Sequence, residues 1–184
     1  PELEKQMKSL SANDTIIFLH IMGSHGPTYF KRYPDDHKIF TPACEQSDIQ
    51  NCSDEEIVNT YDNTILFTDY VMANIIKILQ QHEGEVNSSM LYVSDHGESL
   101  GENGLYLHGM PYAIAPEEQT HVPLITWLSK GEMKKQKLNQ SCLKKKAKEG
   151  NFSHDNFAHT ILGLARVQTE IYKPEMDIFE NCRG

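Results

Sequence analysis

The sequence predicts a domain of the α/β class, in which buried strands alternate with helices. Three short apolar runs are typical of buried strands, and they span residues 15–22, 90–94 and 122–128. Two other segments repeat apolar residues at helical spacing, a long one from Ser53 to Gly84 and a shorter one from Ser153. A chain of 184 residues is long enough to bury one core, so we expect a single domain.

The segments between these strands are punctuated by recognisable signals. The polar start, residues 1–11, is typical of the end of a helix, and the first strand runs into Gly23-Ser-His-Gly-Pro27. A long polar loop follows until Ser53-Asp-Glu-Glu56, whose capping-box pattern predicts the start of the long helix. The lysine-rich stretch at residues 130–148 predicts a solvated helix or loop, and Ser153-His-Asp-Asn156 predicts the cap of the last helix.

Composition excludes several classes of function. The formal net charge is -9, so the chain lacks the basic footprint of a nucleic-acid-binding protein, and we expect no nucleic-acid partner. No apolar run approaches the roughly 20 residues that span a bilayer. The chain opens with Pro1 rather than an initiator Met, and we expect it to be a fragment of a longer protein.

A metal site is predicted where the second strand ends, at Asp95-His96-Gly97. A carboxylate and an imidazole form part of a zinc ligand set, and ligands of α/β sheets gather at the carboxyl ends of strands. Alone, the pair is equally explained by a turn. Two further His-Gly pairs, at His25 and His108, favour a metal-assisted phosphoryl or sulfuryl site.

Other clusters have simpler interpretations. His154 and His159 are five residues apart, which is not the spacing of a helical metal pair, so we expect capping and packing there. The spacing of the cysteines leaves open whether Cys44 and Cys52 form a disulfide or remain two thiols. The pairing of the other two, Cys142 and Cys182, is equally open.

The stretch Ser94–Gly109, with residues 23–27 and 111–123, resembles the phosphoethanolamine–lipid A transferases. That family includes the chromosomal and mobile colistin-resistance enzymes and lies within the alkaline phosphatase/sulfatase superfamily. The resemblance implies a three-layer α/β/α sandwich, alkaline-phosphatase-like, of which residues 1–184 would be the C-terminal portion of the catalytic domain. It also implies a periplasmic catalytic domain, carried on the bacterial inner membrane by an N-terminal domain.

The resemblance also assigns roles to individual residues. Asp95 and His96 match two ligands of the catalytic Zn²⁺, and His25 and His108 match histidines that face the substrate phosphate and can hold a second zinc. Glu98 matches an acidic residue of the same pocket, so the predicted catalytic residues are His25, His108 and Glu98. Cys44 and Cys52 match a disulfide of the family.

The implied reaction is a ping-pong transfer, which confers polymyxin resistance. A zinc-activated Thr attacks the phosphorus of phosphatidylethanolamine, diacylglycerol leaves, and phosphoethanolamine passes to a lipid A phosphate. The family's nucleophilic Thr and a Glu zinc ligand have no counterpart in this sequence, so we expect the chain by itself to be inactive.

Two alternatives differ in class. A hydrolase of the same superfamily, a sulfatase or phosphodiesterase, would share the metal site, although the sulfatase motif Cys/Ser-x-Pro-x-Arg does not occur in the chain. A non-catalytic binding module would keep the fold alone. The presence of Asp95, His96, His25 and His108 together argues against the binding module, because such a module needs none of them.

Overall fold

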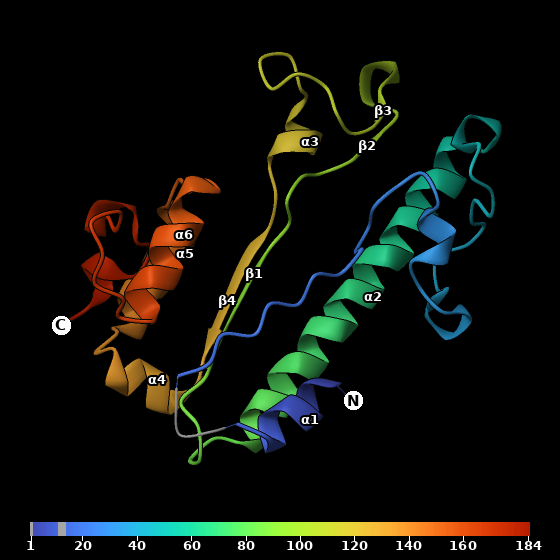
Figure 1. Cartoon of the computed structure of the whole chain (residues 1–184). Helices are drawn as coiled ribbons and strands as arrows, with labels where there is room; N and C mark the ends of the chain where they lie inside the picture. Colours follow the sequence, from blue (N-terminus) through green and yellow to red (C-terminus); the bar gives the residue numbers. More distant parts are fainter. Residues whose placement is uncertain (1, 11–13) are drawn as a thin grey trace. The chain divides into compact units, whose positions relative to one another are not determined.

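The computed structural model describes residues 2–10 and 14–184, and these fall into two compact units (Figure 1). The histidine unit consists of residues 16–78 and 92–125. The C-terminal unit consists of the described residues up to Thr15, residues 79–91 and residues 126–184. The predicted metal site lies entirely in the histidine unit.

The long helix of the histidine unit, α2, spans Asp54–Gln81 and confirms the predicted helix. It begins at the predicted capping box: the Ser53 backbone N–H donates to Glu56 Oε2 at 2.7 Å, and the Glu56 N–H donates to Ser53 Oγ at 3.3 Å. The Ser53 backbone N–H and the Ser53 hydroxyl, which both donate to Glu56 Oε2, lower the pKa of the Glu56 carboxyl. The reciprocal bonds satisfy two backbone donors that an uncapped helix would leave free.

A small hairpin in the same unit carries two of the predicted site residues at its ends. Strands β2 (Ser99–Leu100) and β3 (Tyr106–Leu107) pair antiparallel, so that Ser99 faces Leu107. Leu100 and Leu107 pack against a buried cluster that contains Cys44, and Cys44 forms a disulfide with Cys52. The disulfide is therefore confirmed, and it belongs to the core that supports the hairpin.

Short elements complete this unit: η1 (Tyr29–Lys31), η2 (Asp35–His37), η3 (Ile49–Asn51), η4 (Glu102–Gly104) and α3 (Glu117–Thr120).

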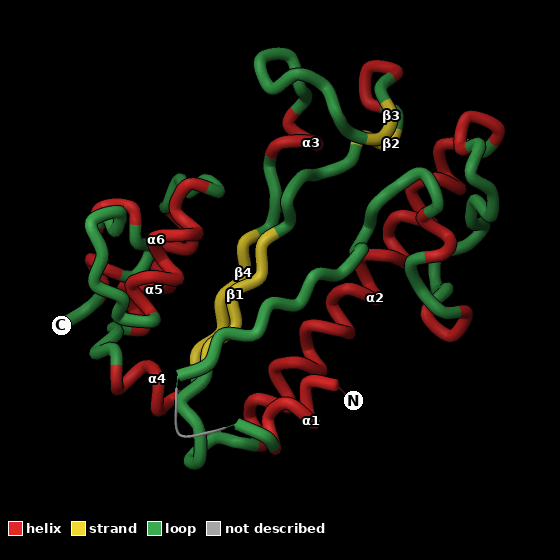
Figure 2. The backbone as a smooth tube through the Cα atoms, viewed as in Figure 1, coloured by secondary structure: helices red, strands yellow, loops and turns green. Residues whose placement is uncertain are grey.

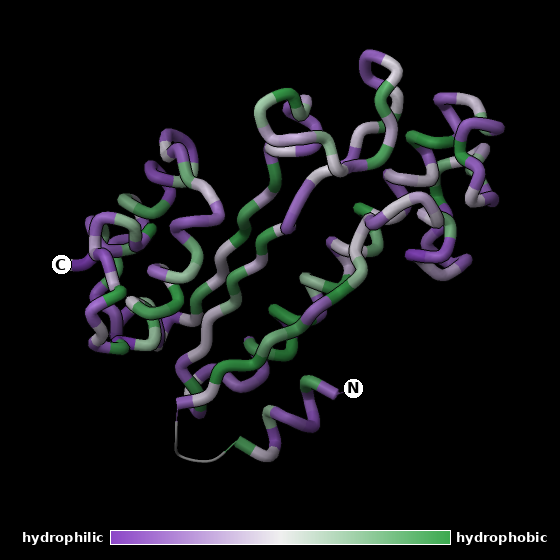
Figure 3. The backbone as a smooth tube through the Cα atoms, turned by 45° about the horizontal axis from the view of Figure 1, so that its top comes forward, coloured by the Kyte–Doolittle hydropathy of each residue, from purple (hydrophilic) through white to green (hydrophobic). Residues whose placement is uncertain are grey.

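The predicted buried strand at residues 15–22 is wrong for this chain. The segment is a loop, shown in green in Figure 2, and it belongs to neither sheet of the described residues. Its apolar side chains are exposed, Phe18 by 78% and Ile16 by 56%, and Figure 3 shows the apolar stretch as a green run. A strand requires a neighbouring strand to accept and donate its backbone hydrogen bonds, and the described residues provide none here.

The other two predicted strands are confirmed. β1 (Ser89–Val93) and β4 (Leu124–Leu128) form a two-stranded sheet. Beyond their ends, Ser94 N–H donates to the Pro123 carbonyl at 3.3 Å and Ser129 N–H donates to the Ser88 carbonyl at 2.9 Å. These two bonds show that β1 and β4 run antiparallel.

The C-terminal unit is mostly helical. Its helices are α1 (Glu2–Lys8), α4 (Lys130–Lys135), α5 (Gln140–Glu149) and α6 (Asp155–Leu164), with the short turns η5 (Pro174–Met176) and η6 (Glu180–Cys182). The lysine-rich stretch therefore forms two helices, and the last predicted helix is α6. A second disulfide joins Cys142 of α5 to Cys182 of η6. Among the helices of the described residues, none combines the length and apolar character that a bilayer crossing needs.

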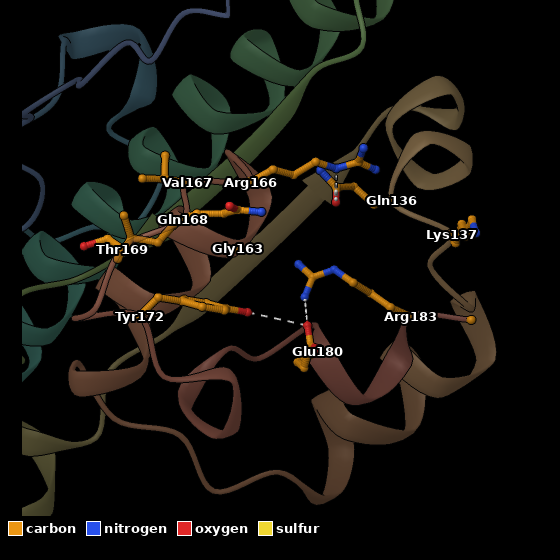
Figure 4. Close-up of a pocket in the computed structure, with 12 residues that line it drawn as sticks. Gln136, Lys137, Gly163, Arg166, Val167, Gln168, Thr169, Tyr172, Glu180 and Arg183 are labelled. Carbon is orange, nitrogen blue, oxygen red and sulfur yellow. Dashed lines mark hydrogen bonds and ion pairs between the residues drawn. The ribbon is translucent and has the colours of Figure 1, made fainter.

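A pocket of about 550 Å³ opens in the C-terminal unit. Figure 4 shows that Tyr172 and Arg183 both reach Glu180, while Arg166 lies beside Gln136. These contacts join the end of α4 to the segment after α6, and join the loop at Tyr172 to η6; none of the residues predicted to carry chemistry lines the pocket.

Candidate metal centre

Three histidines that are far apart in the sequence meet in the histidine unit. His25, His96 and His108 each offer a ring nitrogen, and these atoms all lie within 4.8 Å of one another. The His96 and His108 rings stack with centroids 4.0 Å apart, and the His25 centroid is 4.8 Å from that of His108. The structure thus brings together three of the predicted site residues. Within the described part of the chain, this is the one group of three that is compact enough to share a cation.

The backbone around these histidines is held by close packing at two glycines. A Cβ at Gly97 would lie 2.0 Å from the Glu118 carbonyl oxygen, and a Cβ at Gly26 would lie 2.6 Å from Leu107 Cδ2. The Gly97 N–H also donates to the Gln119 carbonyl at 3.0 Å. At these two positions glycine leaves room for other parts of the protein, because a Cβ would collide with them.

The hydrogen bonds of the three rings set which nitrogen is free. His25 Nδ1 lies 2.6 Å from the Gly26 carbonyl oxygen, and His96 Nδ1 lies 2.9 Å from the Gly97 carbonyl oxygen. His108 Nδ1 lies 3.0 Å from Glu98 Oε1. A carbonyl or carboxylate oxygen only accepts, so each Nδ1 carries the proton, and each neutral ring keeps an unprotonated Nε2. An Nδ1–H bonded to oxygen is the usual arrangement of a histidine whose other nitrogen binds a metal.

Glu98 is buried beside this cluster, with 6% of its surface exposed. Its Oε1 accepts from the Gly26 N–H and from His108 Nδ1, both at 3.0 Å, and its Oε2 accepts from the Tyr29 hydroxyl at 3.2 Å. Three donors compensate the cost of burying the carboxylate. Glu98 therefore orients neighbouring groups, and its predicted catalytic role stays a prediction.

Asp95 lies at the edge of the cluster. Its side chain is 83% exposed, and its Oδ2 is 4.0 Å from His96 Nε2. Oδ1 accepts from the His96 backbone N–H at 3.1 Å. Asp95 is thus next to His96 but outside the compact group of three histidines, and its predicted role as a zinc ligand stays a prediction.

Two residues outside the predicted catalytic and metal residues also shape the site. Tyr29 is 1% exposed, and burial and the neighbouring Glu98 carboxylate raise the pKa of its phenol above the usual range. Arg32 donates from Nε to the His25 carbonyl at 2.9 Å and from Nη2 to Thr28 Oγ1 at 3.1 Å, which fixes the loop that carries His25. Sequence reasoning missed Tyr29, because its bond to Glu98 spans 69 residues and no local pattern indicates it.

The second histidine cluster behaves as expected. His159 Nδ1 accepts from the Lys173 backbone N–H at 3.2 Å, and its ring lies beside Tyr172 with centroids 6.5 Å apart. These contacts are packing and backbone contacts of α6, as the sequence predicted.

Comparison with known families places the chain. The family model described as Sulfatase matches residues 1–167. The chain belongs to the sulfatase family. Within that family its similarity is to phosphoethanolamine transferases, which confirms the resemblance found in the motifs around Asp95 and His108. This chain is 51% identical over 170 residues to phosphoethanolamine transferase EptA of Salmonella typhimurium. The match covers 92% of the chain and 31% of the relative.

Two further comparisons extend this result. Phosphatidylethanolamine transferase Mcr-1 of Escherichia coli is 44% identical over 163 residues, or 89% of the chain and 28% of the relative. The solved soluble domain of lipooligosaccharide phosphoethanolamine transferase A from Neisseria meningitidis matches with a TM-score of 0.94 at 43% identity, covering 100% of the chain and 55% of that structure. This match confirms the alkaline-phosphatase-like α/β fold. The chain spans about a third of the length of the curated relatives it matches.

Proposed function

We propose that this chain contributes the histidine portion of the catalytic centre of a zinc-dependent phosphoethanolamine transferase that modifies lipid A. The observation that supports the proposal most is the cluster of His25, His96 and His108, whose ring nitrogens lie within 4.8 Å of one another and in which each Nδ1 faces an oxygen acceptor. The high identity to relatives named as phosphoethanolamine transferases supplies the substrate class.

The residues present fit a zinc ion. Zinc sites in proteins take imidazole nitrogens readily, and three imidazole ligands leave one coordination position for water or substrate. When bound, Zn²⁺ would supply Lewis acidity toward a phosphoryl oxygen. The chain's own residues would hold the ion through the Nε2 atoms, while Gly26, Gly97 and Glu98 fix the tautomers by accepting from Nδ1.

The proposed reaction follows the family. The hydroxyl of a Thr that is not in this sequence attacks phosphorus, the bond to diacylglycerol breaks, and a lipid A phosphate later takes the phosphoethanolamine from that Thr. The cationic and dipolar groups of the site would stabilise the negative charge that develops on the phosphoryl oxygens. Because the nucleophile is supplied from elsewhere, we expect no turnover by the 184-residue chain alone.

The proposal extends to location and consequence. Integral membrane phosphoethanolamine transferase A of Neisseria meningitidis, which matches 99% of this chain over 34% of its own length, supports a membrane-anchored enzyme with this domain facing the periplasm. Two disulfides support an oxidising compartment. Addition of phosphoethanolamine would reduce the negative charge of lipid A and hence its attraction for polymyxins such as colistin.

Zinc binding to the 184-residue chain tests the metal centre. We expect single substitutions His25→Ala, His96→Ala and His108→Ala each to weaken zinc affinity by at least ~10-fold in competition with a chromophoric chelator, since each removes a ligand. His159→Ala, in the packing cluster of α6, is the matched control and should leave affinity unchanged. Equal zinc affinity in the wild type and in a variant that lacks all three histidines would refute the metal centre.

The transferase assignment needs a chimaera. The chain would replace the matching part of Salmonella EptA, and labelled phosphatidylethanolamine would be supplied with lipid A. If the chimaera is a transferase, label should appear on lipid A. If it is the alternative hydrolase, label should be released into water as phosphoethanolamine. Labelled product from the isolated chain would contradict the expectation that it lacks the nucleophile.

A further inference from the structure

Tyr29 occupies an unusual place for a tyrosine in a loop. It lies in η1, four residues after His25, and only 1% of its surface is exposed. Its ring packs on the backbone at Gly26, since a Cβ there would lie 2.7 Å from the Tyr29 Cζ and hydroxyl oxygen. The ring also meets Tyr61 edge to face, with centroids 5.6 Å apart. These packing contacts account for the burial of the Tyr29 ring, but they do not account for the position of its hydroxyl.

The Tyr29 hydroxyl contacts the Glu98 carboxylate, which also accepts from the Gly26 N–H and from His108 Nδ1. Glu98 Oε1 is shared by the His108 ring and by the Gly26 N–H, so a single oxygen both orients His108 and holds the peptide that follows His25. The carboxylate can keep Oε1 in that position only if it does not rotate about its last side-chain bond. The Tyr29 hydroxyl, at 3.2 Å from Oε2, holds the second oxygen and so opposes that rotation.

We propose that Tyr29 is a positioning residue for the metal centre: its hydroxyl fixes the Glu98 carboxylate, which in turn sets the tautomer of His108 and clamps the loop of His25. The inference rests on the proposed function for the identity of the metal. Its structural content, the dependence of the His108 tautomer on Tyr29, does not require that a metal bind.

The tautomer is the first readout. In the metal-free chain, nitrogen chemical shifts of His108 should show the proton on Nδ1, although a histidine in water prefers the proton on Nε2. Tyr29→Phe keeps the ring and removes the hydroxyl, so we expect a measurable shift of the population toward Nε2–H. An unchanged tautomer in Tyr29→Phe, or an Nε2–H tautomer in the wild type, would overturn the inference.

Zinc affinity is the second readout. Substituting a group that orients a metal ligand typically costs ~10–100-fold in metal affinity, and we expect Tyr29→Phe to fall in that range. Glu98→Gln should weaken binding as well, and the double variant should lose less than the product of the two single losses, because both substitutions break the same connection.

Tyr61→Phe is the matched control, because it removes the hydroxyl of the adjacent, half-buried tyrosine. We expect it to leave both the His108 tautomer and the zinc affinity unchanged. Equal effects of Tyr61→Phe and Tyr29→Phe would indicate general loosening of the packing and would refute the positioning role. Absence of zinc binding in the wild type would refute the proposed function, while the tautomer measurement would still decide the role of Tyr29.

Discussion

Replacing Asp177 with alanine should destabilise the C-terminal unit by about 3 kcal/mol, at the lower end of the range for breaking a buried ion pair. The Asp177 side chain is fully buried, and its Oδ2 accepts from Arg183 Nη1 at 2.6 Å and from the Tyr172 hydroxyl at 2.9 Å. Its Oδ1 accepts from the Phe179 backbone N–H at 2.9 Å. Alanine would leave all three donors without this acceptor. Arg183 would keep only its contact with the half-exposed Glu180, which is why the lower end of the range applies.

The chain contains a convenient reporter for this experiment. Its single tryptophan, Trp127, lies in β4 and within the C-terminal unit. At an m-value of about 2 kcal/mol/M, a loss of 3 kcal/mol lowers the midpoint of urea unfolding, followed by tryptophan fluorescence, by about 1.5 M. Glu149→Ala removes an acid of the same unit whose pair with Lys145 is exposed, and its effect should stay within about 0.5 kcal/mol. Equal midpoints for the Asp177 and Glu149 variants would show that the buried pair contributes nothing beyond a surface pair.

Three further outcomes follow from local geometry. Lys137 has φ 54° just after the end of α4, so Lys137→Gly should raise stability by about 0.5–1 kcal/mol, measured as a higher urea midpoint, and a lower midpoint would contradict this. Gly97→Ala should weaken zinc binding by ~10-fold or more without removing a ligand, because the new Cβ would displace the turn at His96 from Glu118; unchanged affinity in the chelator assay would refute the close approach. Burial and the bond to Asp177 raise the pKa of Tyr172 to about 12 from 10, so its neutral form stabilises the fold below pH 10, and this contribution is lost between pH 10 and pH 12. Urea midpoints across that window should fall less steeply in Tyr172→Phe than in the wild type, and parallel curves would contradict the shift.

The elements that the sequence predicted well are those whose signal is local. The capping box at Ser53 and Glu56 needs only neighbouring residues, and it marked the start of α2 correctly. The apolar run at residues 90–94 predicted β1, and the Asp-His-Gly turn behind it predicted where His96 would lie. Local sequence also predicted α6, because its apolar spacing is a property of one helix.

The elements that it missed depend on partners distant in the chain. Residues 15–22 have the composition of a buried strand, but no strand of the described residues pairs with them, so the composition alone misled. The partnership of Tyr29 with Glu98 and the pairing of Cys142 with Cys182 are contacts over 69 and 40 residues, which no local pattern encodes. The three histidines could be predicted as candidates, whereas the orientation of their nitrogens required the structure.

The two disulfides close loops that lie in different units, so reduction should destabilise the two units to different extents. By chain entropy alone, the Cys142–Cys182 bond, over 40 residues, restricts the unfolded chain by about 4 kcal/mol, and the Cys44–Cys52 bond, over 8 residues, by about 2.5 kcal/mol. A thiol reductant would therefore loosen the helical C-terminal unit more than the unit that holds the histidines. The shorter bond has the more direct functional meaning, because Cys44 belongs to the buried cluster against which Leu107, the residue before His108, packs. Protein made in a reducing cytoplasm would lack the Cys44–Cys52 disulfide. Its metal affinity would therefore depend on whether the preparation had been oxidised.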